Sequence, residues 1–84
     1  MRCQLPLEIS REDHFWMARS SAVTGLLVTG ETFDQLLDEL PVVTQALFEV
    51  SQEQGWSFVR DAPEIEPEDI VWIFNLPHQV LQAA

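Results

Sequence analysis

A short stretch with the spacing of a phosphate-binding loop is the first feature of this sequence that could do chemistry. Residues 25–32 read GLLVTGET, and the two glycines, Gly25 and Gly30, stand where a P-loop has them. Glu31, however, occupies the position of the lysine that reaches the terminal phosphates, and a carboxylate there repels a polyanion. The bulky residues between the glycines are typical of a short buried strand. A nucleotide site is therefore excluded, and the glycines need another explanation.

Acidic residues are densest near position 65, where they invite comparison with a metal site. They are Asp61, Glu64, Glu66, Glu68 and Asp69. Catalytic carboxylates normally come from several elements that converge on a dry cleft, whereas these belong to one proline-containing segment. We interpret the segment as a solvated turn that binds no metal. If it has a further role, it should dock arginines or lysines of a basic partner, which would make association fast and salt-sensitive.

The other reactive residue types have no arrangement that suggests catalysis. His14 and His78 have no serine or cysteine placed by the sequence to complete a triad. Cys3 lies in an alternating apolar pattern, so we expect it to pack and not to react. Three tryptophans could stack on RNA bases, but the chain lacks the basic groove that the RNA backbone requires. The sequence thus predicts a protein that is not an enzyme and uses no cofactor.

Charge narrows the choice of partners. Fourteen acidic residues face four arginines and no lysine in 84 residues, which gives a formal net charge of -10. Such a chain should bind neither nucleic acid nor anionic membranes, because both are bound mainly through basic residues. The charge serves either a basic protein partner or solubility alone. With one cysteine, no long apolar run and no signal-peptide pattern, we expect a single cytoplasmic domain over residues 1–84.

Alternating residues predict a three-stranded antiparallel meander at the start of the chain. Residues 3–10 place apolar side chains on one face and polar ones on the other, and Pro6 favours an edge position. Residues 14–19 form a second strand that is apolar on both faces, and residues 25–29 form the third. Gly30 then ends the third strand at a tight turn, where freedom to adopt a positive φ is useful.

A long helix and one or two further strands complete the predicted fold. Thr32 should cap the helix in a capping box with Gln35, and the apolar stripe runs on to a stop at Gly55. The stripe keeps its phase across Pro41, so we expect one kinked helix. Residues 56–60 and 70–76 have the composition of strands, which either pair as a hairpin or lie at opposite edges. The fold class is α+β, and residues 78–84 form a short tail.

The width of one helix predicts a homodimer. A helix is about 10 Å wide and covers part of one sheet face only, yet apolar residues point to both sides of the last strand. Trp16 and Ala18 are expected on the side that the helix leaves open. A second copy is the ordinary cover for such a surface, and we expect Trp16, Trp72 and Phe74 at the interface.

The motifs together resemble one known family. Residues 15–20 (FWMARS), the turn GLLVTGET and the helix start FDQLLDELPVV are similar to the HicB-like antitoxin family. There, a strand pair leads into a Gly-containing turn whose threonine, Thr32 here, opens the main helix. The resemblance implies a partial RNase-H-like fold, β-β-β-α-β, used for binding and not for hydrolysis. It also implies a small basic RNA-cleaving toxin as the partner in a toxin–antitoxin system.

Two features depart from the family pattern. Thr24 stands where the family usually has proline, and the sequence carries no helix-turn-helix or ribbon-helix-helix. The resemblance therefore points to a branch without a DNA-binding domain. The acidic loop and the acidic side of the helix are the expected docking surface, the latter formed by Asp34, Asp38, Glu39, Glu49 and Glu53. The alternative is an orphan homodimeric regulatory or interaction protein with no toxin partner.

Overall fold

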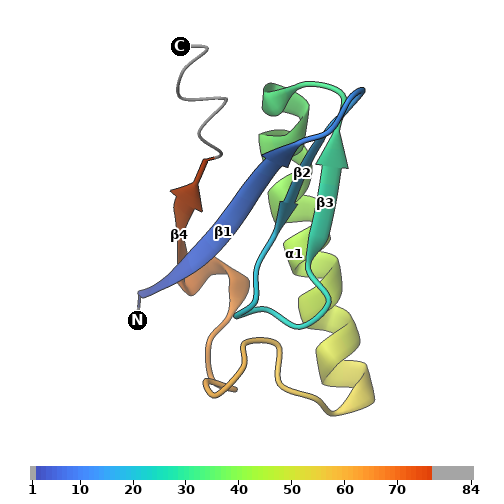
Figure 1. The fold of residues 1–84 in the computed structure, drawn as a ribbon. Helices are drawn as coiled ribbons and strands as arrows, with labels where there is room; N and C mark the ends of the chain where they lie inside the picture. The colour runs from blue at the N-terminus through green and yellow to red at the C-terminus, as the bar shows by residue number, and fades with distance from the viewer. Residues whose placement is uncertain (1, 77–84) are drawn as a thin grey trace.

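A computed structural model describes residues 2–76 and shows an α+β fold in that part of the chain. In chain order its elements are β1 (Cys3–Arg11), β2 (Trp16–Arg19), β3 (Leu27–Gly30), α1 (Phe33–Gln54), the 3-10 helix η1 (Pro67–Asp69) and β4 (Ile70–Asn75). The strands form one mixed sheet in the order β3-β2-β1-β4, with α1 behind it (Figure 1). The predicted fold class is confirmed, whereas the predicted tail at residues 78–84 lies outside the described residues.

The alternation in β1 decides which face of the sheet is buried. Leu5, Leu7 and Ile9 are buried, while the residues between them point outward. β1 pairs antiparallel with β2 and parallel with β4, so it is an interior strand and not the edge strand that Pro6 favoured. Pairing with β2 begins at Glu8, so no described strand lies on that side of β1 beside Pro6. The missing N–H of proline is tolerated at such a position.

Both ends of α1 are capped by the residues that the sequence indicated. The hydroxyl of Thr32 accepts a hydrogen bond from the Gln35 amide at 3.1 Å, and the Gln35 side chain accepts one from the Glu31 amide at 3.0 Å. The backbone thus gains a reciprocal cap, displaced by one residue from the usual capping box. Gly55 ends the helix with φ 79°, and its amide donates to the Ser51 carbonyl at 2.9 Å. α1 runs through Pro41 as one element.

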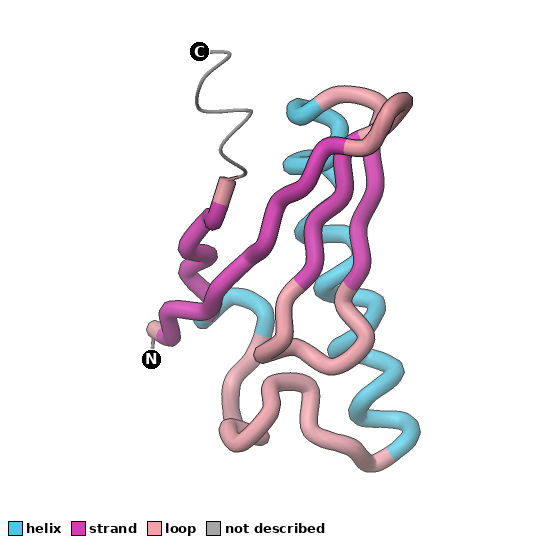
Figure 2. The backbone as a smooth tube through the Cα atoms, viewed as in Figure 1, coloured by secondary structure: helices cyan, strands magenta, loops and turns pink. Residues whose placement is uncertain are grey.

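The core lies between the inner face of the sheet and α1, and the loop after α1 closes one end of it. That loop brings Phe58, Val59 and Ile65 into the core, and it passes below the strands in Figure 2. The Phe58 ring meets the Phe48 ring of α1 edge to face, with 5.4 Å between centroids. Edge-to-face packing of this kind adds to the burial of the two rings.

The predicted strand at residues 56–60 is wrong, because the segment makes a single bridge. Val59 pairs with Val23, and the Arg60 amide donates to the Ala22 carbonyl at 2.8 Å. Both segments turn away directly afterwards, at Gly25 with φ 77° and at Asp61 with φ 63°. The pairing between the two segments therefore cannot extend beyond this bridge. β4 is the single strand after α1 in the described chain, and it occupies one edge of the sheet while β3 occupies the other.

Gly30 serves a different purpose from the one expected of it. Its φ is not positive, since the glycines with positive φ in the described chain are Gly25 and Gly55. A Cβ added at Gly30 would instead lie 2.6 Å from the amide nitrogen of Leu36. Gly30 is thus required because the strand end and the first turn of α1 touch backbone to backbone. Gly25 meets the other need, which is the turn that leads into β3.

Candidate partner-binding surface

The solvent side of α1 is an acidic surface. Its five carboxylates, all on exposed residues, are Asp34, Asp38, Glu39, Glu49 and Glu53. At 100° per residue these positions fall within an arc of roughly 140°, directly opposite the stripe that faces the core. The helix contains no lysine, arginine or histidine. The acidic side that the sequence suggested is therefore one continuous face, which we call the α1 acidic face.

Two exposed valines add apolar surface to the α1 acidic face, one within it and one at its border. Val42 is 62% exposed and Val50 is 41% exposed. Val42 lies near the middle of the acidic arc, one position away from the exposed Pro41. A face that only kept the chain in solution would need no apolar side chain at its centre, whereas protein interfaces combine apolar contacts with charges around them.

Two arginines of the described chain have partners on the sheet. Arg19 on β2 reaches the Glu8 carboxylate of β1 at 3.8 Å, and the Arg11 guanidinium stands 5.4 Å from the ring centre of Trp16. Within residues 2–76, Arg19–Glu8 is the single ion pair, so no carboxylate of α1 is neutralised by a neighbouring cation. Repulsion among these carboxylates is relieved by salt or by a basic partner.

The acidic residues of the loop predicted to dock a partner have two different roles in the structure. Glu64, Glu66 and Glu68 are exposed, whereas Asp69 is partly buried. The Asp69 carboxylate accepts a hydrogen bond from the Glu66 amide at 3.1 Å, so it holds the start of η1. Asp61 is exposed and stands in a left-handed turn with φ 63°. Of the five predicted docking residues, Glu66 and Asp69 share the capping box of η1, and the other three face solvent.

The expected position of Trp16 and Ala18 on the uncovered side of the sheet is wrong. Ala18 is fully buried, and the Trp16 ring lies 5.2 Å from the Phe33 ring of α1. Antiparallel pairing sets Ala18 opposite the buried Ile9, which places both on the face toward the helix. A strand that is apolar on both sides gives no indication of which side is buried, and for this reason the sequence misplaced these residues.

Trp72 and Phe74 also lie on the inner face of the sheet. In the parallel pairing of β1 with β4, Trp72 stands beside Leu5 and Phe74 beside Leu7. Phe74 remains 42% exposed, although its ring meets the Phe33 ring edge to face at 6.5 Å. Both residues are therefore only partly covered on the helix side. The apolar surface that α1 leaves partly exposed therefore lies at β4, not on the outer face of the meander.

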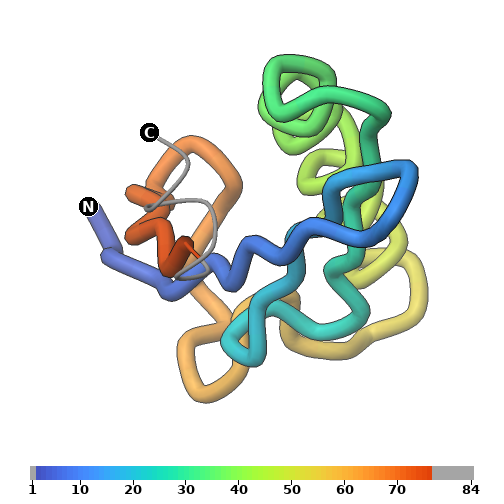
Figure 3. The backbone as a smooth tube through the Cα atoms, turned by 45° about the horizontal axis from the view of Figure 1, so that its top comes forward, coloured from blue at the N-terminus to red at the C-terminus, as the bar shows by residue number. Residues whose placement is uncertain are grey.

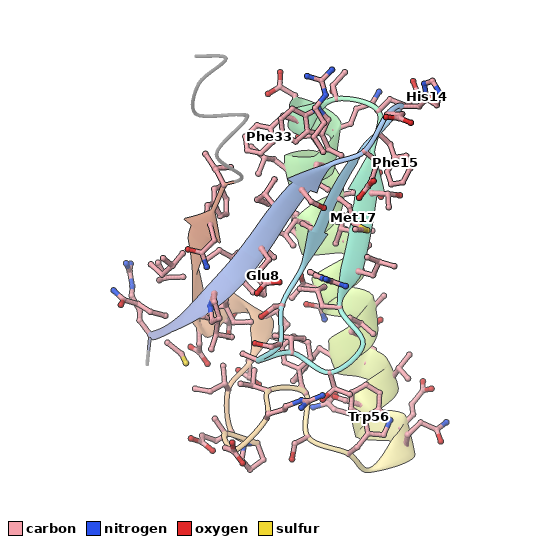
Figure 4. All side chains as sticks on the ribbon, in the orientation of Figure 1. Glu8, His14, Phe15, Met17, Phe33 and Trp56 are labelled. Atoms are coloured by element: carbon pink, nitrogen blue, oxygen red, sulfur yellow. The ribbon has the colours of Figure 1, made fainter. Side chains whose placement is uncertain are left out.

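The outer face of the sheet is mixed in character. Glu8 and Met17 stand on it in Figure 4, toward the viewer and away from α1. It carries the Glu8–Arg19 pair together with exposed apolar residues at the two edge strands, Leu27 on β3 and Ile73 on β4. A face on which polar and apolar residues are mixed in this way is compatible with water.

Two grooves flank α1 on its two sides. The first, at the β3 side, has a volume of about 530 Å³ and is lined by Phe15, Thr29, Gly30, Glu31, Gln35, Asp38 and Glu39. Phe15 lies beside His14 at the tip of the β1–β2 turn, at the opposite end of the molecule from Trp56 (Figure 4). We call the second the β4–α1 groove; it is lined by Leu40, Pro41, Thr44, Gln45, Pro67, Glu68, Ile70 and Trp72. Among the described residues, neither lining contains a basic one.

No three histidine, cysteine, aspartate or glutamate side chains in residues 2–76 are close enough together to hold a metal ion. Cys3 is partly buried and packs against the core, and His14 is exposed at a turn, while His78 lies outside the described residues. Within residues 2–76, no helix combines the length and the apolar character that a membrane span requires.

The β4–α1 groove is the feature that the sequence did not reveal. Its walls come from α1, η1 and β4, which are separated in the chain by a loop of no regular pattern. The only signal was the width of a helix, which predicted that α1 leaves part of the sheet uncovered. Comparisons of the chain with protein-family models, with curated proteins and with solved structures found no significant match.

Proposed function

We propose that this chain is a non-catalytic protein-binding module that docks a small basic protein on the α1 acidic face. The observation that carries the proposal is the segregation of charge. Five carboxylates share one side of α1 without a cation among the described residues, and exposed Val42 lies among them. Like charges collected on one face are costly to the free protein and favourable to a complex with an oppositely charged partner.

The class of partner follows from the resemblance to HicB-like antitoxins. A small basic RNA-cleaving toxin presents cationic surface around its RNA site, because RNA binding depends on neutralising phosphates. An acidic module that covers such a surface competes with RNA by charge and by bulk. We therefore propose occlusion of the toxin as the mode of action, in the cytoplasm and without contact between this chain and nucleic acid.

The test uses co-expression of a tagged copy of this chain with a small, basic, histidine-containing reading frame adjacent to its gene. We expect the two proteins to purify together at physiological salt and to separate at high salt, and RNA cleavage by the partner to stop when the complex forms. The expected salt dependence follows from screening of the charges that dock. If the partner is not retained by the tagged chain even at low salt, the proposal is wrong.

A matched pair of triple variants distinguishes the α1 acidic face from net charge alone. One variant changes Glu39, Glu49 and Glu53 to glutamine, and the other changes Glu8, Glu12 and Asp13 to their amides. Both variants remove three exposed negative charges, but only the first removes them from α1. We expect the first to weaken the complex by about tenfold or more and the second by much less. Equal weakening would mean that the partner responds to overall charge and not to this face.

A homodimer without a toxin is the second candidate, and the edge of β4 favours it. β4 reads IVWIFN, contains no charge and no proline, and has one described neighbour, β1. Edge strands are usually protected by charge, proline or a bulge, and an unprotected edge tends to pair with another strand. The β4 edges of two copies would then join two sheets into one, which sedimentation at micromolar concentration detects as a dimer.

A further inference from the structure

The β4–α1 groove exists because α1 does not cover the whole inner face of the sheet. α1 packs against β3 and β2, which lie at the other side of the sheet from β4. In the rotated view of Figure 3, β4 stands apart from α1, whereas η1, which leads into β4, contacts α1. The space between β4 and α1 has a volume of about 460 Å³ and is floored by Leu40, Ile70 and Trp72.

A smaller hollow extends the groove along α1. It has a volume of about 220 Å³ and shares Gln45, Pro67 and Glu68 with the first. Phe48 and Glu66 are its additional walls. The two together form one open channel between α1 and η1, apolar at the β4 end and acidic at the η1 end.

The charge at the rim of the β4–α1 groove has no counter-ion in the described chain. Glu66 and Glu68 are both exposed, and neither forms an ion pair within residues 2–76. No described residue that lines either hollow is basic. An apolar floor beside carboxylates that form no ion pair is complementary to a segment that carries apolar and cationic side chains together.

We infer that the β4–α1 groove holds an amphipathic basic segment of the protein partner, with an apolar side chain over Trp72 and lysine or arginine at Glu66 and Glu68. The inference rests on the proposed docking of a basic protein and assigns that docking a specific recess. It adds an apolar contact, which attraction between two charged surfaces does not supply. Apolar anchors in pockets contribute most of the affinity in protein interfaces.

The same chemistry argues against a second copy of this chain in the groove. Each copy has a formal charge of -10, and insertion would bring more carboxylates onto a rim that already holds Glu66 and Glu68. Like charges placed together are unfavourable by several kcal/mol at an interface. The β4 edge and the β4–α1 groove are therefore different surfaces that suit different occupants.

Fluorescence of Trp72 provides the test. In a chain whose other tryptophans are replaced, Trp16→Phe and Trp56→Phe, emission reports on the groove alone. The probe is a synthetic amphipathic peptide of leucine and lysine, with a leucine–glutamate peptide of the same pattern as its control. We expect the lysine peptide to shift Trp72 emission to the blue on binding, because an apolar side chain replaces water at the ring. The glutamate peptide should leave the emission unchanged.

Two exposed glutamines of α1 supply matched variants that keep the fold. Gln45 lines the groove, whereas Gln52 lies seven positions on, about two turns further along the same side of the helix. Each substitution, Gln45→Arg and Gln52→Arg, adds one positive charge to the same side of α1. We expect Gln45→Arg to weaken binding of the lysine peptide by about tenfold, and Gln52→Arg by about twofold or less. Circular dichroism checks that both variants are folded.

The outcomes separate this inference from the proposal on which it rests. A blue shift that Gln45→Arg abolishes and Gln52→Arg spares supports the groove. Binding seen by calorimetry without any Trp72 shift, or weakened equally by both arginines, overturns the groove and leaves docking on the α1 acidic face in place. No binding of the lysine peptide by calorimetry at low salt overturns both.

Discussion

Gly30 and Leu36 touch through their backbones, because a Cβ on Gly30 would lie 2.6 Å from the Leu36 amide nitrogen. Neither backbone can withdraw easily, since Gly30 ends β3 and Leu36 lies in the first turns of α1 with 1% exposure. We expect Gly30→Ala to lower the free energy of unfolding by about 1–3 kcal/mol, the usual range for overpacking. Urea unfolding measures the change.

Gly55 is the control for this substitution. It has φ 79° and no atom within 4 Å of an added Cβ, so Gly55→Ala incurs backbone strain without a clash. The expected loss is about 1 kcal/mol. A loss for Gly30→Ala no greater than that for Gly55→Ala would show that the close contact with α1 is relieved by a small shift.

The hydroxyl of Thr32 supports the first turn of α1 by accepting the Gln35 amide at 3.1 Å. We expect Thr32→Ala to reduce the free energy of unfolding by about 1 kcal/mol, because the amide loses its partner. Thr32→Ser retains the hydroxyl and should recover most of the loss. The two variants are compared by thermal unfolding, and equal losses would rule out the cap as the cause.

Local patterns in the sequence were sufficient to predict most elements of the fold. Alternation placed β1, and the capping residues Thr32 and Gly55 placed both ends of α1 to within a residue. These features depend on neighbours a few positions apart, so they are visible in a sequence. Segment 56–60 was mistaken for a strand because its composition is strand-like, while its ladder is limited by turns elsewhere at Gly25 and Asp61.

The candidate site depended on relationships that the sequence does not contain. The α1 acidic face was predictable, because helix periodicity alone groups its carboxylates. The β4–α1 groove was not, because it follows from which strands α1 covers and from the pairing of β4 with β1. Trp16 was assigned to the wrong face for a similar reason, since the register with Ile9 and Arg11 decides its direction.

Salt should stabilise the protein, because fourteen acidic residues face four arginines. Charges interact over about 30 Å at 0.01 M ionic strength and over about 8 Å at 0.15 M, so repulsion across the molecule is screened at the higher value. We expect the unfolding temperature to rise over this interval. The change is followed by circular dichroism in sodium chloride.

The variant with glutamine at positions 39, 49 and 53 tests where that repulsion acts. It should be more stable than the parent chain at low salt and should show a smaller rise with added salt, because α1 no longer carries three of its carboxylates. An unchanged salt response would place the repulsion elsewhere in the molecule.

Exposed apolar residues on the two edge strands permit a paired test of self-association. Ile73 on β4 is 45% exposed and Leu27 on β3 is 53% exposed. If β4 edges pair, Ile73→Lys should convert a dimer to a monomer, because charge on an edge strand opposes pairing. Leu27→Lys should leave the dimer intact. Analytical ultracentrifugation distinguishes these results, and a parent chain that is monomeric at micromolar concentration excludes the homodimer.

The pairing of β1 with β4 has a consequence for synthesis on the ribosome. The partners Cys3 and Ile70 stand near opposite ends of the described chain, so β1 emerges long before the strand that flanks it. The nascent chain can form the meander and α1 while one side of Leu5 and Leu7 still lacks its neighbours Trp72 and Phe74. During that interval the unfinished sheet is most open to wrong partners, and late closure by β4 ends the exposure.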